Sequence, residues 1–208
     1  MIDSSNQIVN VGSGNVRITR NNGTTWSSKS FATSGEAVSF ALSPDYDNDS
    51  SVLLGVDDSF VCISEDGGSH WDAIPAGVPT STTAGNCAVA FDSDYSGAGS
   101  NKFLYAAHDV DNAVYRLDFG TDTSWKRIDG VTTATTWPAA STPGTSLFND
   151  TTVPGIVTAN GAVYVSDNGT ASIPVLRSIN PRLSYTIPRG PYFESMADAW
   201  TPAAAKGI

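Results

Sequence analysis

The 208-residue chain has few charged side chains, no basic stripe and no long apolar run. Charged residues make up 15% of it, and 21 acidic against 11 basic residues leave a net charge of −10. Without a basic surface to neutralise phosphates, we expect no binding to nucleic acid. No segment approaches the roughly 18 apolar residues of a membrane span. The first residues also lack the basic and apolar segments of a signal peptide.

Histidine, glutamate and cysteine are scarce, which leaves few candidates for metal or nucleophile sites. His70 and His108 have no metal-ligand spacing, and we interpret them as surface or turn residues. Cys62 and Cys87 lie in apolar, strand-like runs, so we expect them to be buried and free. A disulfide between neighbouring repeats is the alternative, and it would indicate an oxidising compartment.

Glycine, proline, serine and threonine are abundant instead. With 19 Gly and 11 Pro, the composition is typical of short strands joined by many turns. We therefore predict an all-β fold. Its length allows a substantial core in one domain.

The most informative stretch is Ser64-Glu65-Asp66-Gly67-Gly68-Ser69-His70-Trp71, which follows an alternating strand pattern. An Asp side chain at position 66 can accept hydrogen bonds from backbone N–H groups that the turn leaves free. Gly68 lets the chain reverse without a Cβ clash. Trp71 then anchors the returning strand with a large apolar side chain.

The same spacing recurs along the chain. Asn21, Gly23 and Trp26 repeat it, with Asn in place of Asp, and a slipped third copy ends at Trp125. The first two Trp-to-Trp intervals fall near the roughly 40–50 residues of a propeller blade. A β-sandwich with coincidental Trp-ended hairpins is the alternative.

Strand and turn signals divide the chain into four units at 8–34, 36–77, 85–131 and 150–201. The first unit lacks its first strand, so we expect a piece of a longer protein. Residues 132–149 read as an extended insertion, and residues 194–197 as a helical turn. The strand at 37–42 is apolar except for Ser39, which predicts burial on both faces.

Together with the loop Ser43-Pro44-Asp45-Tyr46-Asp47-Asn48-Asp49, the turn at 64–71 resembles those of Asp-box, or BNR-type, β-propeller repeat proteins. These include bacterial cell-surface and S-layer-like proteins, sortilin-like propellers and xyloglucanase-like glycoside hydrolases. The resemblance covers residues 8–131 well and 150–200 loosely. It implies a β-propeller or part-propeller of about four four-stranded blades, with the Asp-box stabilising a peripheral turn.

The loop that precedes the second strand of unit two is a candidate calcium site. Asp45, Asp47 and Asp49 place three carboxylates at alternating positions, and Ca²⁺ takes six to eight oxygen ligands. The alternative is a loop in which Asp49 accepts hydrogen bonds from backbone N–H groups.

We expect a non-catalytic, extracellular structural or binding module of the cell-surface or S-layer kind. Its expected partners are further copies of itself or further blades of the same propeller, with a glycan as another candidate. The alternative is a carbohydrate-active enzyme, a glycoside hydrolase or sialidase-like protein, with its cleft at the propeller centre. Such an enzyme needs two carboxyl groups about 5–10 Å apart across a groove. An intracellular assembly factor of the photosystem type is a third alternative.

Overall fold

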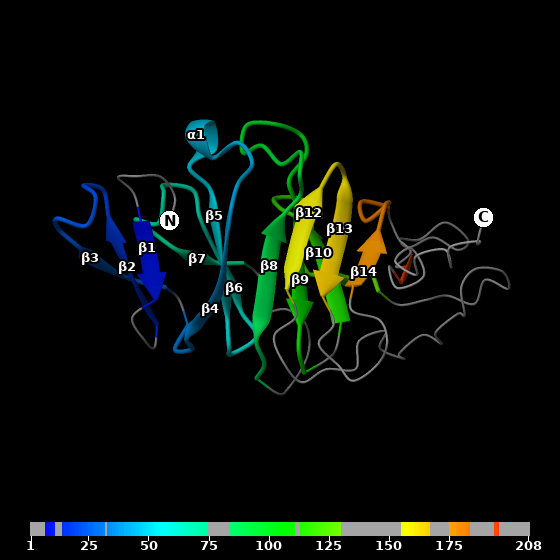
Figure 1. The fold of residues 1–208 in the computed structure, drawn as a ribbon, viewed down its shortest axis with the longest axis horizontal. Helices are drawn as coiled ribbons and strands as arrows, with labels where there is room; N and C mark the ends of the chain where they lie inside the picture. The colour runs from blue at the N-terminus through cyan, green and yellow to red at the C-terminus, as the bar shows by residue number, and fades with distance from the viewer. Residues whose placement is uncertain are drawn as a thin grey trace, which may run out of the picture.

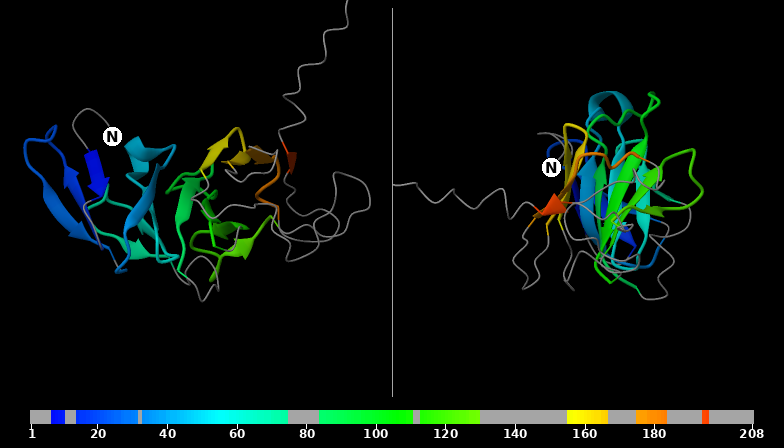
Figure 2. Two further views of the ribbon diagram at one scale, coloured as in Figure 1. Left: turned by 60° about the horizontal axis from the view of Figure 1, so that its bottom comes forward. Right: turned by 90° about the vertical axis from the view of Figure 1, so that its right-hand side faces the viewer.

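The computed structural model describes residues 7–10, 14–31, 33–74, 84–110, 113–129, 155–166, 175–183 and 194–195. These residues form four antiparallel sheets that follow one another along the chain, from sheet 1 at the left of Figure 1 to sheet 4 at the right. A turned view shows the same succession (Figure 2). The predicted all-β class is confirmed. The predicted insertion at 132–149 lies outside the described residues.

The sheets are formed by strands that are consecutive in sequence. Sheet 1 contains β1 (Gln7–Asn10), β2 (Asn15–Thr19) and β3 (Ser27–Ser30). Sheet 2 contains β4 (Ala37–Leu42), β5 (Val52–Val56), β6 (Val61–Ser64) and β7 (Asp72–Ala73). Sheet 3 contains β8 (Cys87–Phe91), β9 (Phe103–His108), β10 (Ala113–Asp118) and β11 (Lys126–Arg127). Sheet 4 contains β12 (Ile156–Ala159), β13 (Ala162–Ser166), β14 (Val175–Ser178) and β15 (Glu194–Ser195).

Two short elements differ from the prediction. The loop after β4 contains a single helical turn, α1 (Tyr46–Asp49), whose first bonds run from the N–H groups of Asn48 and Asp49 to the carbonyl of Asp45. The helical turn predicted at 194–197 is wrong, because Glu194 and Ser195 pair with β14 as strand β15. Pairing gives backbone groups at the edge of a sheet the partners they need. Within the described residues, no helix is long and apolar enough to cross a membrane.

Sheet 1 has three strands in the described part of the chain, whereas the other sheets have four. The turn between β2 and β3 matches the turn between β6 and β7, so β1 to β3 correspond to β5 to β7. The counterpart of β4, the first strand of a unit, is the one that sheet 1 lacks there.

An apolar cluster fills each junction between neighbouring sheets. Sheets 1 and 2 bury Val16 against Leu54 and Trp71, sheets 2 and 3 bury Leu53 against Val89, and sheets 3 and 4 bury Tyr105 against Val163. Strands β5 and β6 are therefore buried on both faces. Cys62 and Cys87 are free and buried, as predicted.

Candidate functional site

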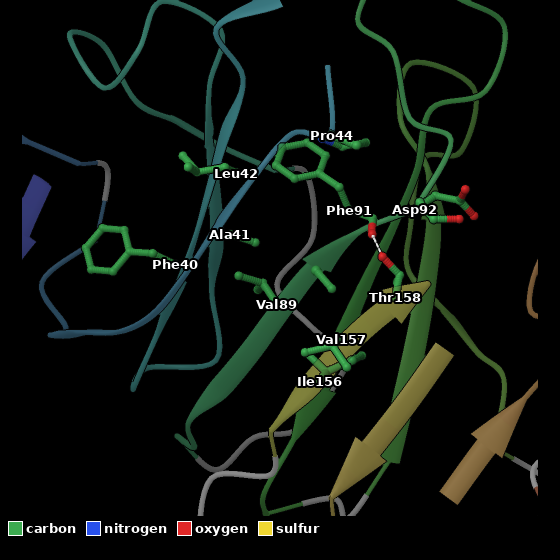
Figure 3. Close-up of a pocket in the computed structure, with 12 residues that line it drawn as sticks. Phe40, Ala41, Leu42, Pro44, Val89, Phe91, Asp92, Ile156, Val157 and Thr158 are labelled. Carbon is green, nitrogen blue, oxygen red and sulfur yellow. Dashed lines mark hydrogen bonds between the residues drawn. The ribbon is translucent and has the colours of Figure 1, made fainter. Parts of the chain in front are cut away.

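Strands β4, β8 and β12, the first strands of three successive sheets, lie side by side and form a groove (Figure 3). We call them the inner strands. The groove has a volume of about 360 Å³ and is lined mainly by apolar side chains, among them Phe40, Leu42, Val89 and Val157. It is an apolar surface built from three sheets.

The prediction that residues 37–42 are buried on both faces is wrong. Along β4 the exposed and covered residues alternate, and Phe40 is 40% exposed. Val38 and Leu42 are exposed in the same row, and Val157 on β12 is 62% exposed. Four large apolar side chains on the inner strands thus face outward where a further layer would normally cover them.

Two hydroxyl groups hold the inner strands together. Ser39 Oγ on β4 donates a hydrogen bond of 2.7 Å to the carbonyl of Cys87 on β8. Thr158 Oγ1 on β12 donates one of 2.6 Å to the carbonyl of Phe91, which is drawn in Figure 3. Both bonds cross a junction between sheets, so the shape of the groove is fixed before anything binds.

Asp92, at one end of the groove, is the centre of a buried polar cluster. It accepts hydrogen bonds from Tyr105 Oη at 2.9 Å and Arg182 Nε at 2.8 Å, and Arg182 Nη2 makes a second, bidentate contact. Arg182 also pairs with Asp94. Burial opposes ionisation of Asp92, but these donors outweigh it and lower its pKa. The bond to Asp92 raises the pKa of Arg182, while burial and the same carboxylate raise the pKa of Tyr105.

This cluster limits the chemistry of the groove. Asp92 is the one carboxylate in the described lining, and its two oxygens are occupied by Arg182 and Tyr105. Hydrolysis of a glycosidic bond needs two carboxyl groups that face a common sugar site. The described residues of the groove therefore offer an apolar contact surface with a neutralised rim.

The turn at 64–71 has the hydrogen bonds predicted from its sequence. Asp66 Oδ1 accepts bonds from the N–H groups of Ser69 at 2.8 Å and His70 at 2.9 Å, and from Ser64 Oγ at 2.9 Å. Ser64 Oγ also accepts a bond of 2.8 Å from the N–H of Gly68. Gly68 has φ +90, and a Cβ there would lie 3.0 Å from Ile8 Cδ1 of sheet 1. Trp71 is 6% exposed and packs into the junction with sheet 1.

The first copy of the turn repeats these bonds with different residues. Thr19 Oγ1 takes the place of the serine hydroxyl and accepts a bond of 3.0 Å from the N–H of Gly23. Asn21 Oδ1 accepts a bond of 2.9 Å from the N–H of Thr25, as the Asp does in the second copy. Trp26 is 38% exposed and donates from Nε1 to the carbonyl of Gly23. The turn geometry is kept, but the Trp is not buried.

The third copy keeps the buried Trp and changes the turn. Trp125 is buried in the junction between sheets 2 and 3. The carboxylate that binds a backbone N–H here is that of Asp122, which comes later in the turn than Asp66 does in the second copy. Asp122 Oδ2 accepts a bond of 3.0 Å from the N–H of Asp118. Burial opposes ionisation of Asp122, but bonds from Lys126 and Asp118 lower its pKa. The slipped spacing in the sequence thus corresponds to a different carboxylate.

Asp66 gives a test by pH. Burial opposes its ionisation, but hydrogen bonds from His70, Ser64 and Ser69 lower its pKa to about 2. The stability it contributes is therefore present above the unfolded pKa of about 3.9 and is lost as the pH falls towards 2. The variant Asp66→Asn places at this position the residue found at Asn21, and its side chain does not titrate. We expect its melting temperature to fall less between pH 4 and pH 2 than that of the wild type. An unchanged slope in the variant would contradict the assignment.

The calcium prediction meets a different arrangement. Asp45 accepts bonds from Asn48 and from Ser96 Oγ, and Asp49 accepts bonds from the N–H groups of Ser51 at 2.8 Å and Gly97 at 3.0 Å. The bonds from Asn48 and Ser96 lower the pKa of Asp45. Asp47 is exposed. In the described part of the chain, no three His, Cys, Asp or Glu side chains are grouped so that they could hold a metal ion. Calcium binding at Asp45, Asp47 and Asp49 remains a prediction from sequence alone.

Sequence reasoning missed a polar residue that recurs at the end of the second strand of sheets 2, 3 and 4, either as its last residue or directly after it. Asp57, Asp109 and Ser166 each accept a hydrogen bond from the N–H of the residue before the inner strand, at 2.7 Å, 2.8 Å and 2.7 Å. We call these bonds the latches. The signal for them was the recurrence of a polar residue at the end of an apolar strand.

His70 and His108 have different surroundings. The His70 side chain is 86% exposed and contacts Asp66, as expected for a turn residue. The interpretation of His108 as a surface or turn residue is wrong, because it is fully buried with Nε2 at 2.8 Å from Ser59 Oγ. Ser59 Oγ also accepts a bond of 2.9 Å from the N–H of Gly85. The pair therefore belongs to the packing between sheets 2 and 3.

No protein-family model and no curated protein matches the sequence. Among solved structures, YCF48 bound to D1 peptide is 14% identical with a TM-score of 0.51, and the match covers 94% of this chain and 52% of that one. The GH74 xyloglucanase from Xanthomonas campestris is 17% identical with a TM-score of 0.54, covering 85% and 27%. An auxiliary nutrient binding protein from Bacteroides thetaiotaomicron is 12% identical with a TM-score of 0.52, covering 93% and 39%.

The chain thus spans about half of the first of these structures and less of the others. At such low identity the likeness concerns the fold alone. These structures are β-propellers, and the four successive antiparallel sheets have the arrangement of propeller blades. The protein is an all-β part-propeller.

Proposed function

We propose that the protein is a non-catalytic, extracellular binding and structural module that associates with a second copy of itself through the inner strands. The observation that carries this proposal is a row of exposed apolar side chains on the inner strands. Phe40, Leu42 and Val157 line the groove, and Val38 is exposed further along β4. Burying such side chains contributes roughly 1.5–3 kcal/mol each. A second copy of the same surface would cover the row by two-fold symmetry.

Charge favours a second copy at this surface. The chain carries a net charge of −10, so two copies repel one another over most of their surface. The described lining of the groove contains Asp92 as its one charged residue, and Arg182 neutralises it. Two copies can therefore meet there without placing unpaired carboxylates together. A second copy would also add four sheets to a chain that spans 52% of YCF48.

The further parts of this proposal come from the sequence. We propose that the turns at Asn21 and Asp66 are Asp-boxes. In both turns a hydroxyl oxygen accepts a bond from the N–H of a glycine, and the Oδ1 atom of Asn21 or Asp66 accepts a bond from an N–H further along the turn. The resemblance to cell-surface and S-layer-like repeat proteins supports an extracellular location and a structural role. Calcium at Asp45, Asp47 and Asp49 would add to the stability of the α1 loop.

A carbohydrate-active enzyme is the second candidate. The likeness in fold to a GH74 xyloglucanase favours it, and the inner strands would then line a glycan cleft. The single, paired carboxylate in the described groove lining argues against hydrolysis there. Release of reducing sugar from xyloglucan by the purified chain would support the enzyme and contradict the non-catalytic module.

Self-association has a matched pair of variants. Phe40 is 40% exposed in the groove, and Phe60 is 37% exposed in the turn before β6, outside the groove lining. We expect the wild type to sediment as a dimer of the 21.7 kDa chain. We expect Phe40→Glu to raise the dissociation constant by roughly 30-fold or more, because a charge would be buried at the centre of the interface.

Phe60→Glu makes the same chemical change without touching the groove. Its dimer should be as stable as that of the wild type in sedimentation equilibrium. A wild-type monomer at all accessible concentrations, or equal weakening by both variants, would reject the inner strands as the interface.

A further inference from the structure

A second, polar crevice lies apart from the groove, between the turn of sheet 1 and the turn of sheet 2. Its volume is about 220 Å³. Amide and hydroxyl groups from Asn21, Thr25, Ser27 and Ser69 line it together with the cations Arg20 and Lys29. It is a hydrogen-bonding surface with two positive charges.

Among the residues that the structure describes, no carboxylate pairs with either charge. Arg20 Nη2 donates to the carbonyls of Asp66 at 3.0 Å and Gly67 at 3.2 Å and to Ser69 Oγ at 2.8 Å, which are neutral acceptors. In the part of the chain that the structure describes, the ammonium group of Lys29 has no hydrogen-bond or ion-pair partner. The carboxylate of Asp66 is turned into its own turn, where the N–H groups of Ser69 and His70 bind it.

The equivalent positions of sheet 2 carry no positive charge. By strand register, Arg20 corresponds to the acidic Glu65 and Lys29 to the apolar Ile74. Between Ser4 and Gly35 the sequence has three basic residues and no acidic one, although the whole chain has 21 acidic residues. Of the four units, only this one has a net positive charge, and the repeat itself does not require it.

We propose that this crevice binds a small oxyanion, a carboxylate, sulfate or phosphate, on a ligand of one sugar's size or less. Arg20 is held in place by its three neutral acceptors, and its Nε and Nη1 groups form no bond to the described residues. Lys29 supplies a second, mobile ammonium group, and the hydroxyls suit further ligand oxygens. The volume is below the ~300 Å³ at which pockets for drug-sized ligands begin. This site is independent of self-association through the groove.

The test compares two variants, each of which replaces one basic residue of sheet 1 by glutamine. The two residues lie on opposite faces of the sheet. Lys29 pairs with Val16 and shares its face, whereas Arg17 points from the other face and is exposed. We expect Lys29→Gln to weaken binding of the oxyanion about tenfold, because one charge-assisted hydrogen bond is lost. Arg17→Gln removes the same charge from the sheet and should change binding by less than about twofold, because solvent screens it.

Binding is measured by amide chemical shifts at constant ionic strength, with sulfate, phosphate, galacturonate and neutral galactose as separate probes. We expect saturable shifts at the Lys29 crevice with the anions and none with galactose. Tighter binding of galacturonate than of sulfate and phosphate would identify an acidic sugar as the ligand class, and the reverse order a simple oxyanion. Absence of saturation with every anion, equal binding of galactose, or equal weakening by Arg17→Gln would overturn the proposal.

Discussion

Replacing Trp71 by Ala should lower the free energy of unfolding by about 3–5 kcal/mol, the cost of deleting a large buried aromatic side chain. Trp71 is 6% exposed and fills the junction between sheets 1 and 2, where it belongs to the same cluster as Val16 and Leu54. Its Nε1 has no hydrogen-bond partner among the described residues. The expected loss is therefore one of packing, with no polar contribution.

The repeat supplies the control for this experiment. Trp26 occupies the same place in the first turn but is 38% exposed, and we expect Trp26→Ala to cost about 1 kcal/mol. Urea unfolding followed by far-ultraviolet circular dichroism measures both, since this signal reports the sheets and does not depend on the tryptophan that is removed. Equal losses would show that the turn, and not burial of the Trp, determines stability.

Asp92→Asn should also destabilise the fold strongly, by about 3 kcal/mol, because it breaks the buried ion pair and leaves the Arg182 guanidinium without its main counter-charge. Asp92 joins Tyr105 of its own sheet to Arg182, which follows the last residues of β14. The control is Asp94→Asn. Asp94 also pairs with Arg182, but its side chain is 62% exposed, so the expected cost is at most about 1 kcal/mol.

The pH dependence separates the two aspartates further. The pKa of Asp92 is lowered, because the bonds from Arg182, Asp94 and Tyr105 outweigh the cost of burial. Its contribution to stability is present above the unfolded pKa of about 3.9 and is lost as the pH falls below that value. Urea unfolding of Asp92→Asn should therefore show a smaller loss of stability between pH 5 and pH 3 than the wild type. A parallel profile for the two proteins would contradict the role of the pair.

The parts of the structure that the sequence predicts correctly are local ones. In the turn at 64–71, the groups that bond one another are two to four residues apart, so the spacing of Ser64, Asp66 and Gly68 contains the geometry. Likewise, the alternation of Val61 and Ile63 with Cys62 and Ser64 predicts β6, and the short apolar run at 52–56 predicts β5. The same rules explain why Asn21 can replace an Asp, because the carbonyl oxygen of either side chain accepts the bond from the turn.

The candidate site depends on residues that are far apart in sequence. Arg182 and Asp92 are 90 positions apart, and no local pattern connects them. The apolar residues of β4 predict burial, yet whether Phe40 is covered depends on how many sheets follow and what packs on the inner strands. The sequence did not predict the crevice either, because the residues that line it, such as Lys29 and Ser69, come from different sheets. The pattern of apolar residues in a segment predicts that it is a strand, but it does not predict which other strands pack against it.

The latches have a consequence for how the chain folds during synthesis. Each one closes within its own unit, over 21, 23 or 11 residues, and pins the inner strand to the end of the strand that follows it. Short loops of this kind close quickly, and the rate of folding rises as contacts become more local. A sheet can therefore form soon after its residues leave the ribosome, before the next unit has been made. The protein would then grow blade by blade, each completed sheet offering an apolar face on which its successor is assembled.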